Sequence, residues 1–289
     1  MLSDQSRLSN DASETVKVPV YHTWLSMKER EYGEPVHPPA MEIPPQEFFP
    51  WAGIVSHHLL AHEYLDAWFS RLAEIRQPLC FYILSPSHYG ISLEPYSLTD
   101  GSWESGLSDL NGLSRLSLVE SDKNKVYKLA EMLEVDLDSG VFQIEHGVST
   151  FMPYIKKYFP DAVVVAITYK GEPPVNVPVS RRLADALENE FDEAGKQEKF
   201  LLISSDFSHH HNLEETIKRD TVSHHYLKKT SDIPWNMVVC DNGPGIYILE
   251  QLGKNDLESY ILYHTNSWEI AHQGEDDITS YFFVYFGDK

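Results

Sequence analysis

The sequence predicts an α/β fold in which helices cover both faces of a central sheet. Five short segments are almost continuously apolar and rich in β-branched or aromatic residues, a pattern typical of strands buried on both faces. Longer amphipathic stretches separate these segments along the chain. Strands that alternate with helices in this way are typical of a sheet with helices on both sides.

The predicted elements follow one another with little interruption after Trp51. The predicted strands span residues 51–56, 80–85, 162–169, 199–204 and 278–287. Apolar residues recur at helical spacing from Leu60 to Leu72 and from Val126 to Leu133. Ser180 is predicted to cap a further helix that runs to Phe191.

The first 50 residues differ in composition from the remainder. The first 15 or so are polar and show no periodicity, and residues 35–50 contain six prolines, each of which fixes φ and lacks a backbone donor. The sequence therefore predicts an extended, proline-rich arm over residues 1–50 and a single α/β domain over residues 51–289.

Composition excludes several classes of partner and compartment. The chain has 289 residues with 44 acidic and 23 basic side chains, a net charge of −21, which disfavours nucleic acids and anionic membrane surfaces. It shows no secretory signal and no apolar run of membrane-spanning length, and its two cysteines fit a reducing compartment. A cytoplasmic protein is expected.

Polar side chains follow three of the predicted strands. His57 follows the first, His88 the second, and Asp206 with His209 the fourth. In open α/β sheets, ligands bind outside the carboxyl ends of the strands, so we expect these residues to line one pocket. Imidazole is a common ligand of zinc, iron and copper, and an aspartate can orient a histidine that transfers protons.

The same residues also allow simpler interpretations. His57 and His58 are adjacent and point in different directions, so at most one is expected to be a ligand. The Glu145–His146 pair fits a ligand pair, an acid/base pair or an exposed polar pair. Cys240 precedes a Gly-Pro-Gly turn and a predicted helix, which fits a reactive or ligating thiolate or an inert buried thiol.

The order of the motifs resembles that of a known family. From Trp51 to the C-terminus the chain carries, in order, SHH (56–58), SPSHYG (85–90), EHGVSTFMPY (145–154), SSDFSHH (204–210), CDNGP (240–244) and SYFFVYF (280–286). This series resembles the MEMO family, whose prokaryotic members are called AmmeMemoRadiSam system protein B. The resemblance implies a central mixed sheet similar to that of class III extradiol dioxygenases.

The resemblance also implies a metal site and its surroundings. By motif position the metal ligands would be His57, His88 and Cys240. His209 would match the family's acid/base histidine, with Asp206 beside it, and His146 would match the histidine of a Glu-His-Ser motif. Iron is the expected metal, with copper or zinc as alternatives for a set of two nitrogens and one sulfur.

Three functions are compatible with this resemblance. The first is a redox or dioxygenase-type reaction on an unknown small molecule, with radical SAM and AMMECR-type proteins as possible partners. The second is a binding module that holds a peptide or an anion, which the replaced motif residues favour, such as Gly147 where the family has Ser. The third is a hydrolase in which metal-bound water attacks and His209 is the base.

Overall fold

A seven-stranded mixed sheet forms the centre of the computed structural model, which describes residues 19–21, 38–91, 94–105, 118–170, 174–229, 232–254, 256–272 and 274–289. The strands, in order across the sheet, are β4 (Tyr96–Leu98), β7 (Val163–Tyr169), β3 (Cys80–Pro86), β8 (Lys199–Ser204), β2 (Ala52–Val55), β10 (Ser280–Asp288) and β9 (Leu257–Asn266). The central strands β7, β3, β8 and β2 are parallel, while β4, β10 and β9 are antiparallel to their neighbours.

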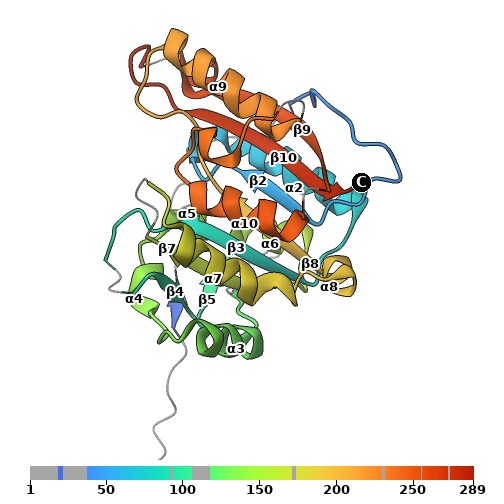
Figure 1. Ribbon diagram of the computed structural model, residues 1–289, viewed down its shortest axis with the longest axis vertical. Helices are drawn as coiled ribbons and strands as arrows, with labels where there is room; N and C mark the ends of the chain where they lie inside the picture. The colour runs from blue at the N-terminus through green and yellow to red at the C-terminus, as the bar shows by residue number, and fades with distance from the viewer. Residues whose placement is uncertain are drawn as a thin grey trace, which may run out of the picture.

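Helices cover both faces of this sheet, as the sequence predicts (Figure 1). One face packs against α3 (Lys123–Leu133), α7 (Val177–Glu188) and α10 (Gly243–Gly253). The other packs against α2 (His62–Ile75), α4 (Ser139–Phe142), α5 (His146–Ser149) and α6 (Met152–Tyr158). The remaining helices are η1 (Leu59–Ala61), α8 (Glu193–Glu198), α9 (Leu213–Leu227), η2 (Trp235–Met237) and α11 (Ser267–Ala271). Among the described residues, none of these helices is long and apolar enough to cross a membrane.

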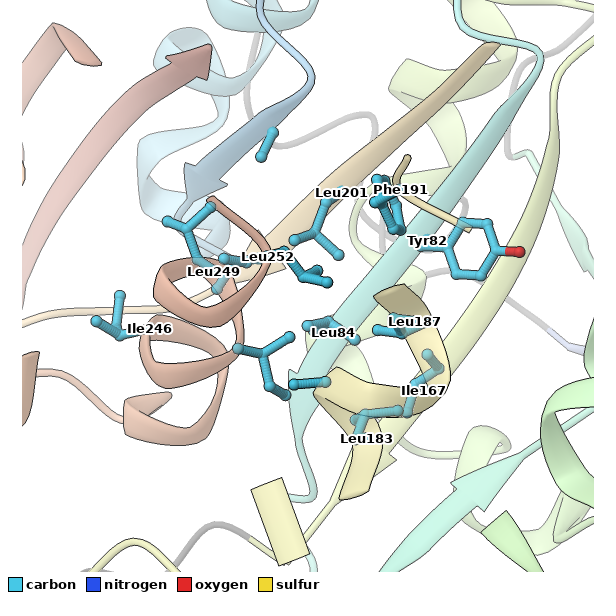
Figure 2. Packing of buried hydrophobic residues seen from close by; sticks show 14 of the residues in the cluster. Tyr82, Leu84, Ile167, Leu183, Leu187, Phe191, Leu201, Ile246, Leu249 and Leu252 are labelled. Carbon is cyan, nitrogen blue, oxygen red and sulfur yellow. The ribbon is translucent and has the colours of Figure 1, made fainter. Parts of the chain in front are cut away.

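Successive side chains of the central strands point to opposite faces of the sheet and form two core layers. Tyr82 and Leu84 of β3 pack with α7 and α10 (Figure 2), whereas Phe81 and Ile83 face the opposite layer. Both sets are buried, which explains why these strands are continuously apolar in sequence. Cys80 is the first residue of β3 and is buried.

The five predicted strands are confirmed within two residues at each end, but one predicted cap is wrong. The helix assigned to Ser180 has its cap four residues earlier, because Asn176 accepts a hydrogen bond from the Val179 amide and Pro178 stands in the first turn. Ser180 is buried inside α7 instead.

A second, three-stranded sheet is formed by β1 (Val20–Tyr21), β5 (Ser102–Glu104) and β6 (Leu118–Glu120). Tyr21 is buried in it, with its ring centroid 5.1 Å from that of Trp103. Farther along, the Met41 amide donates to the Leu262 carbonyl at 2.7 Å. These described parts of the predicted arm contact the α/β domain. Residues 1–18 and 22–37 lie outside the described residues, and the division at residue 50 stays a prediction.

Candidate metal centre

Three neighbouring strands bring polar side chains together at the end of the sheet where the strands' carboxyl ends lie. The parallel strands β3, β8 and β2 lie side by side, and their carboxyl ends lead into His88, Asp206 and His57. His57 Nε2 lies 3.1 Å from His88 Nε2 and 3.6 Å from Asp206 Oδ2. The expected convergence of these strand-end residues is therefore present.

Both histidines are held through Nδ1, so that their Nε2 atoms face each other. His57 Nδ1 is 2.9 Å from the Ser204 hydroxyl, and His88 Nδ1 is 2.6 Å from Glu145 Oε1. Glu145 is buried and also accepts the His88 amide through Oε2 at 2.9 Å. Metal-binding histidines typically donate their second ring nitrogen to such a carboxylate or oxygen, which fixes the ring orientation.

Asp241 adds a carboxylate in which one oxygen is hydrogen-bonded and the other is not. Its Oδ1 accepts hydrogen bonds from the Ser205 hydroxyl at 3.0 Å and the Asp206 amide at 3.1 Å. Its Oδ2 is buried and has no hydrogen-bond partner among the described residues. This oxygen lies 3.4 Å from His57 Nε2 and 3.8 Å from His88 Nε2. A buried, unpartnered carboxylate oxygen is rare and calls for an additional partner.

The spacing of these three atoms fits a metal ion. Ligands about 2.1 Å from a tetrahedral metal lie about 3.4 Å from one another. The separations of 3.1, 3.4 and 3.8 Å between His57 Nε2, His88 Nε2 and Asp241 Oδ2 bracket that value. The residues present therefore fit a metal held by two imidazoles and one carboxylate.

Cys240 does not belong to the closest groups of candidate ligands. Among the described residues, groups of possible ligand atoms that lie within 4.8 Å of one another include His57 with His88 and His146, and His57 with Asp206 and Asp241, and neither of these contains Cys240. Burial raises the pKa of Cys240 to about 12, with the Asp241 charge contributing in the same direction, which favours the neutral thiol in the metal-free protein. A ligand role for Cys240 stays a prediction, and the geometry favours Asp241 as the third ligand.

The predicted acid/base residues lie around the three proposed ligands His57, His88 and Asp241. His209 Nε2 is buried without a hydrogen-bond partner among the described residues and lies 3.7 Å from Asp241 Oδ2. Asp206 instead accepts the Ser56 hydroxyl through Oδ1 at 2.5 Å and faces His57. The ring of His146 lies 4.2 Å from that of His88 and 5.1 Å from that of His57, measured between centroids. His209, Asp206 and His146 are thus grouped in space, and their catalytic roles stay predictions.

The pKa values of the two facing histidines are shifted in opposite directions. Burial lowers the pKa of His57 well below 6.5, although the nearby Asp241 charge opposes this effect. Burial also disfavours the charged form of His88, but the neighbouring carboxylates of Asp241 and Glu145 outweigh it and raise the pKa of His88 to about 9. In the metal-free protein near neutral pH, His57 is therefore neutral and His88 carries a proton.

A cavity of about 730 Å³ opens beside these residues. His88, His209, Cys240 and Asp241 form part of its wall. This volume suits a small organic molecule, for which binding cavities commonly measure about 300–1,000 Å³. A bound molecule would therefore reach the proposed metal ligands directly.

Gly147 gives the His88 ring the space it occupies. A Cβ atom at this position would lie 2.2 Å from Ser85 Oγ and 2.9 Å from His88 Cε1. We expect Gly147→Ala to lower the free energy of unfolding by about 1–3 kcal/mol, because a crowded core shifts its side chains. Urea unfolding measures this change. Gly140→Ala, whose Cβ would meet its nearest atom at 3.4 Å, is the control; equal stability of the two variants would contradict the prediction.

Two residues of this site carry weak signals in the sequence. Asp241 is an acidic residue directly after Cys240, and its place is set by contacts with Asp206, which follows β8 and lies 35 positions earlier. Glu145 is recognisable only as the neighbour of His146, yet its side chain caps α5 and binds His88. Its position immediately before a helix, where acidic caps are common, is the signal that was available.

Two sequence relatives carry the name of the family that the motifs resemble. A MEMO1 family protein from Pyrobaculum aerophilum is 26% identical over 234 residues, covering 76% of this chain and 77% of that protein. A MEMO1 family protein from Pyrobaculum arsenaticum is 26% identical over 266 residues, covering 86% and 88%. The crystal structure of an uncharacterized protein from Escherichia coli K12 aligns with a TM-score of 0.49 and 12% identity, over 81% of this chain and 98% of that one.

The family model described as Memo-like protein matches residues 50–272. This range holds β2, β3, β7 and β8 of the central sheet, and all the residues of the candidate metal centre. It spans well over half of the chain, so the protein belongs to the Memo-like family.

Proposed function

We propose that this protein is a metal-dependent oxidoreductase of the dioxygenase type, in which His57, His88 and Asp241 hold iron or a related metal. The observation that carries the proposal is the buried Oδ2 of Asp241, which has no hydrogen-bond partner in the described chain and faces two imidazole nitrogens. Two histidines and one carboxylate are the ligand set of non-haem iron(II) oxygenases. This set is harder than the two nitrogens and one sulfur suggested by the motif order, and it favours iron over copper(I).

The surrounding residues suit a reaction that moves protons. A metal held by His57, His88 and Asp241 would supply the activation of a bound substrate and oxygen, or of water. His209 lines the cavity, and its unpartnered Nε2 is available to exchange a proton with a bound molecule. Burial, followed by the charge of His88, lowers the pKa of His146, which makes it a neutral proton acceptor near neutral pH.

Elemental analysis of anaerobically purified protein tests this proposal. We expect about one metal ion per chain after loading with iron(II), and oxygen uptake with catechol as a probe that stops on chelation. A protein that takes up neither iron, copper nor zinc would overturn the proposal. Hydrolysis of an ester probe in the absence of oxygen, with no oxygen uptake, would instead support the metal-dependent hydrolase.

Metal affinity is expected to rise with pH because the metal must displace the proton held by His88. The pKa of His88 is raised to about 9, so one proton leaves per metal bound at lower pH. We expect the apparent affinity for zinc to rise about tenfold per pH unit from about pH 6, and to level off near the pKa of His88. Calorimetry in buffers of different ionisation enthalpy measures the released proton. A pH-independent affinity would contradict the protonated state of His88.

A further inference from the structure

The cavity beside the metal centre contains two basic side chains from separate parts of the fold. Lys170 directly follows β7, and Arg219 lies on α9, which contacts β10. In the order of the sheet, β7 and β10 lie on opposite sides of β3, β8 and β2, the strands that lead into the metal centre. The two basic residues therefore approach the cavity from different sides of the site.

The charge of the cavity wall differs from that of the whole protein. The chain has 44 acidic and 23 basic residues, yet the described residues of the cavity wall include Lys170 and Arg219 and one acidic residue, Asp241. A metal ion bound at Asp241 would offset that negative charge. The described part of the wall then offers basic side chains without an uncompensated acidic one in the wall itself, which favours an anionic ligand.

Both basic groups retain capacity to bind an anion. Arg219 uses Nε to donate to Glu215 Oε1 at 2.7 Å, a contact that engages one edge of the guanidinium. Lys170 is exposed, and no carboxylate of the described residues lies within 4 Å of its ammonium group. Apolar and aromatic side chains, including Tyr89, Phe207 and Val239, form other parts of the wall.

We propose that this cavity binds a small organic anion, whose acidic group is held by Lys170 and Arg219 and whose apolar body lies against Tyr89 and Phe207. The inference deepens the proposed function, because it names the substrate class of the same site. The acidic group is a carboxylate or a phosphate. Either group makes charge-assisted hydrogen bonds with arginine and lysine.

Calorimetric titration of the full-length protein, both chelator-treated and metal-loaded, tests the inference. The probes are phenylacetate, phenyl phosphate and the neutral 2-phenylethanol. We expect at least one anion to bind about tenfold or more tightly than the neutral probe, because a hydrogen bond to a charged group contributes at least that factor. The preferred probe distinguishes a carboxylate from a phosphate.

Charge-removing variants identify the residues responsible. The double variant Lys170→Met/Arg219→Met is expected to lower affinity for the anion about tenfold or more, while affinity for 2-phenylethanol stays unchanged. Lys218→Met is the matched control, since Lys218 neighbours Arg219 on α9, also contacts Glu215 and does not line the cavity. It is expected to bind the anion like the parent protein.

Three results would overturn the inference: no binding of either anion, equal binding of the neutral probe, or unchanged anion affinity in the double variant. Metal content separates this inference from the proposed function. The double variant is expected to take up metal like the parent protein, because Lys170 and Arg219 are not ligands. Anion binding by a protein that takes up no metal would sustain this inference and overturn the metal-dependent function.

Discussion

Replacing Asp241 by asparagine is expected to weaken metal binding more than a hundredfold. The substitution keeps the shape of the side chain and an oxygen that accepts from Ser205 and the Asp206 amide, but it removes the negative charge at Oδ2. Residues that only orient a metal ligand commonly change affinity by about 10–100-fold, so loss of a direct ligand exceeds that range. Competition between the protein and a chromophoric chelator for zinc measures the change.

Cys240→Ser distinguishes the two possible third ligands. Its thiol is absent from the closest groups of ligand atoms, and burial raises its pKa to about 12. The variant is therefore expected to keep the metal affinity of the parent protein. If Cys240→Ser lost the metal and Asp241→Asn retained it, the ligand set drawn from the motif order would be correct and the geometric assignment wrong.

The site could be predicted from the sequence only where its residues follow buried strands. His57, His88 and Asp206 are recognisable because each comes after a continuous apolar run, and parallel strands bring such ends together. Asp241 follows no strand. An isolated bridge between Phe207 and Cys240 and the hydrogen bond from the Asp241 amide to the Asp206 carbonyl place it beside the segment that follows β8. These contacts join residues more than 30 positions apart, which local spacing cannot reveal.

The fold shows the same division between strong and weak local signals. The parallel strands β2, β3, β7 and β8 are buried on both faces, so their sequences are continuously apolar and predict strands directly. The edge strand β9 is missing from the prediction because it includes polar residues such as Glu258 and His264. Strands of two or three residues, as in the second sheet, are too short for any period to appear.

Replacing Trp68 by alanine is expected to lower the free energy of unfolding by about 3–5 kcal/mol. This fully buried side chain of α2 lies between the helix and two strands of the sheet. Its ring occupies the space above Gly53 of β2, where a Cβ atom would lie 2.5 Å away, and its centroid is 4.8 Å from that of Tyr285 in β10. Urea unfolding of the metal-free protein measures the loss. Because β2 leads directly into His57, we also expect weaker metal binding.

Two further substitutions separate this contact from the general effect of removing a tryptophan. Trp268→Ala removes a partly exposed indole from α11 and is expected to cost far less, since less apolar area returns to water. Gly53→Ala keeps Trp68 but crowds it from the opposite side, and about 1–3 kcal/mol of destabilisation is expected. A loss in Trp268→Ala as large as that in Trp68→Ala would show that packing between α2 and the sheet is not what stabilises β2, the strand that leads to His57.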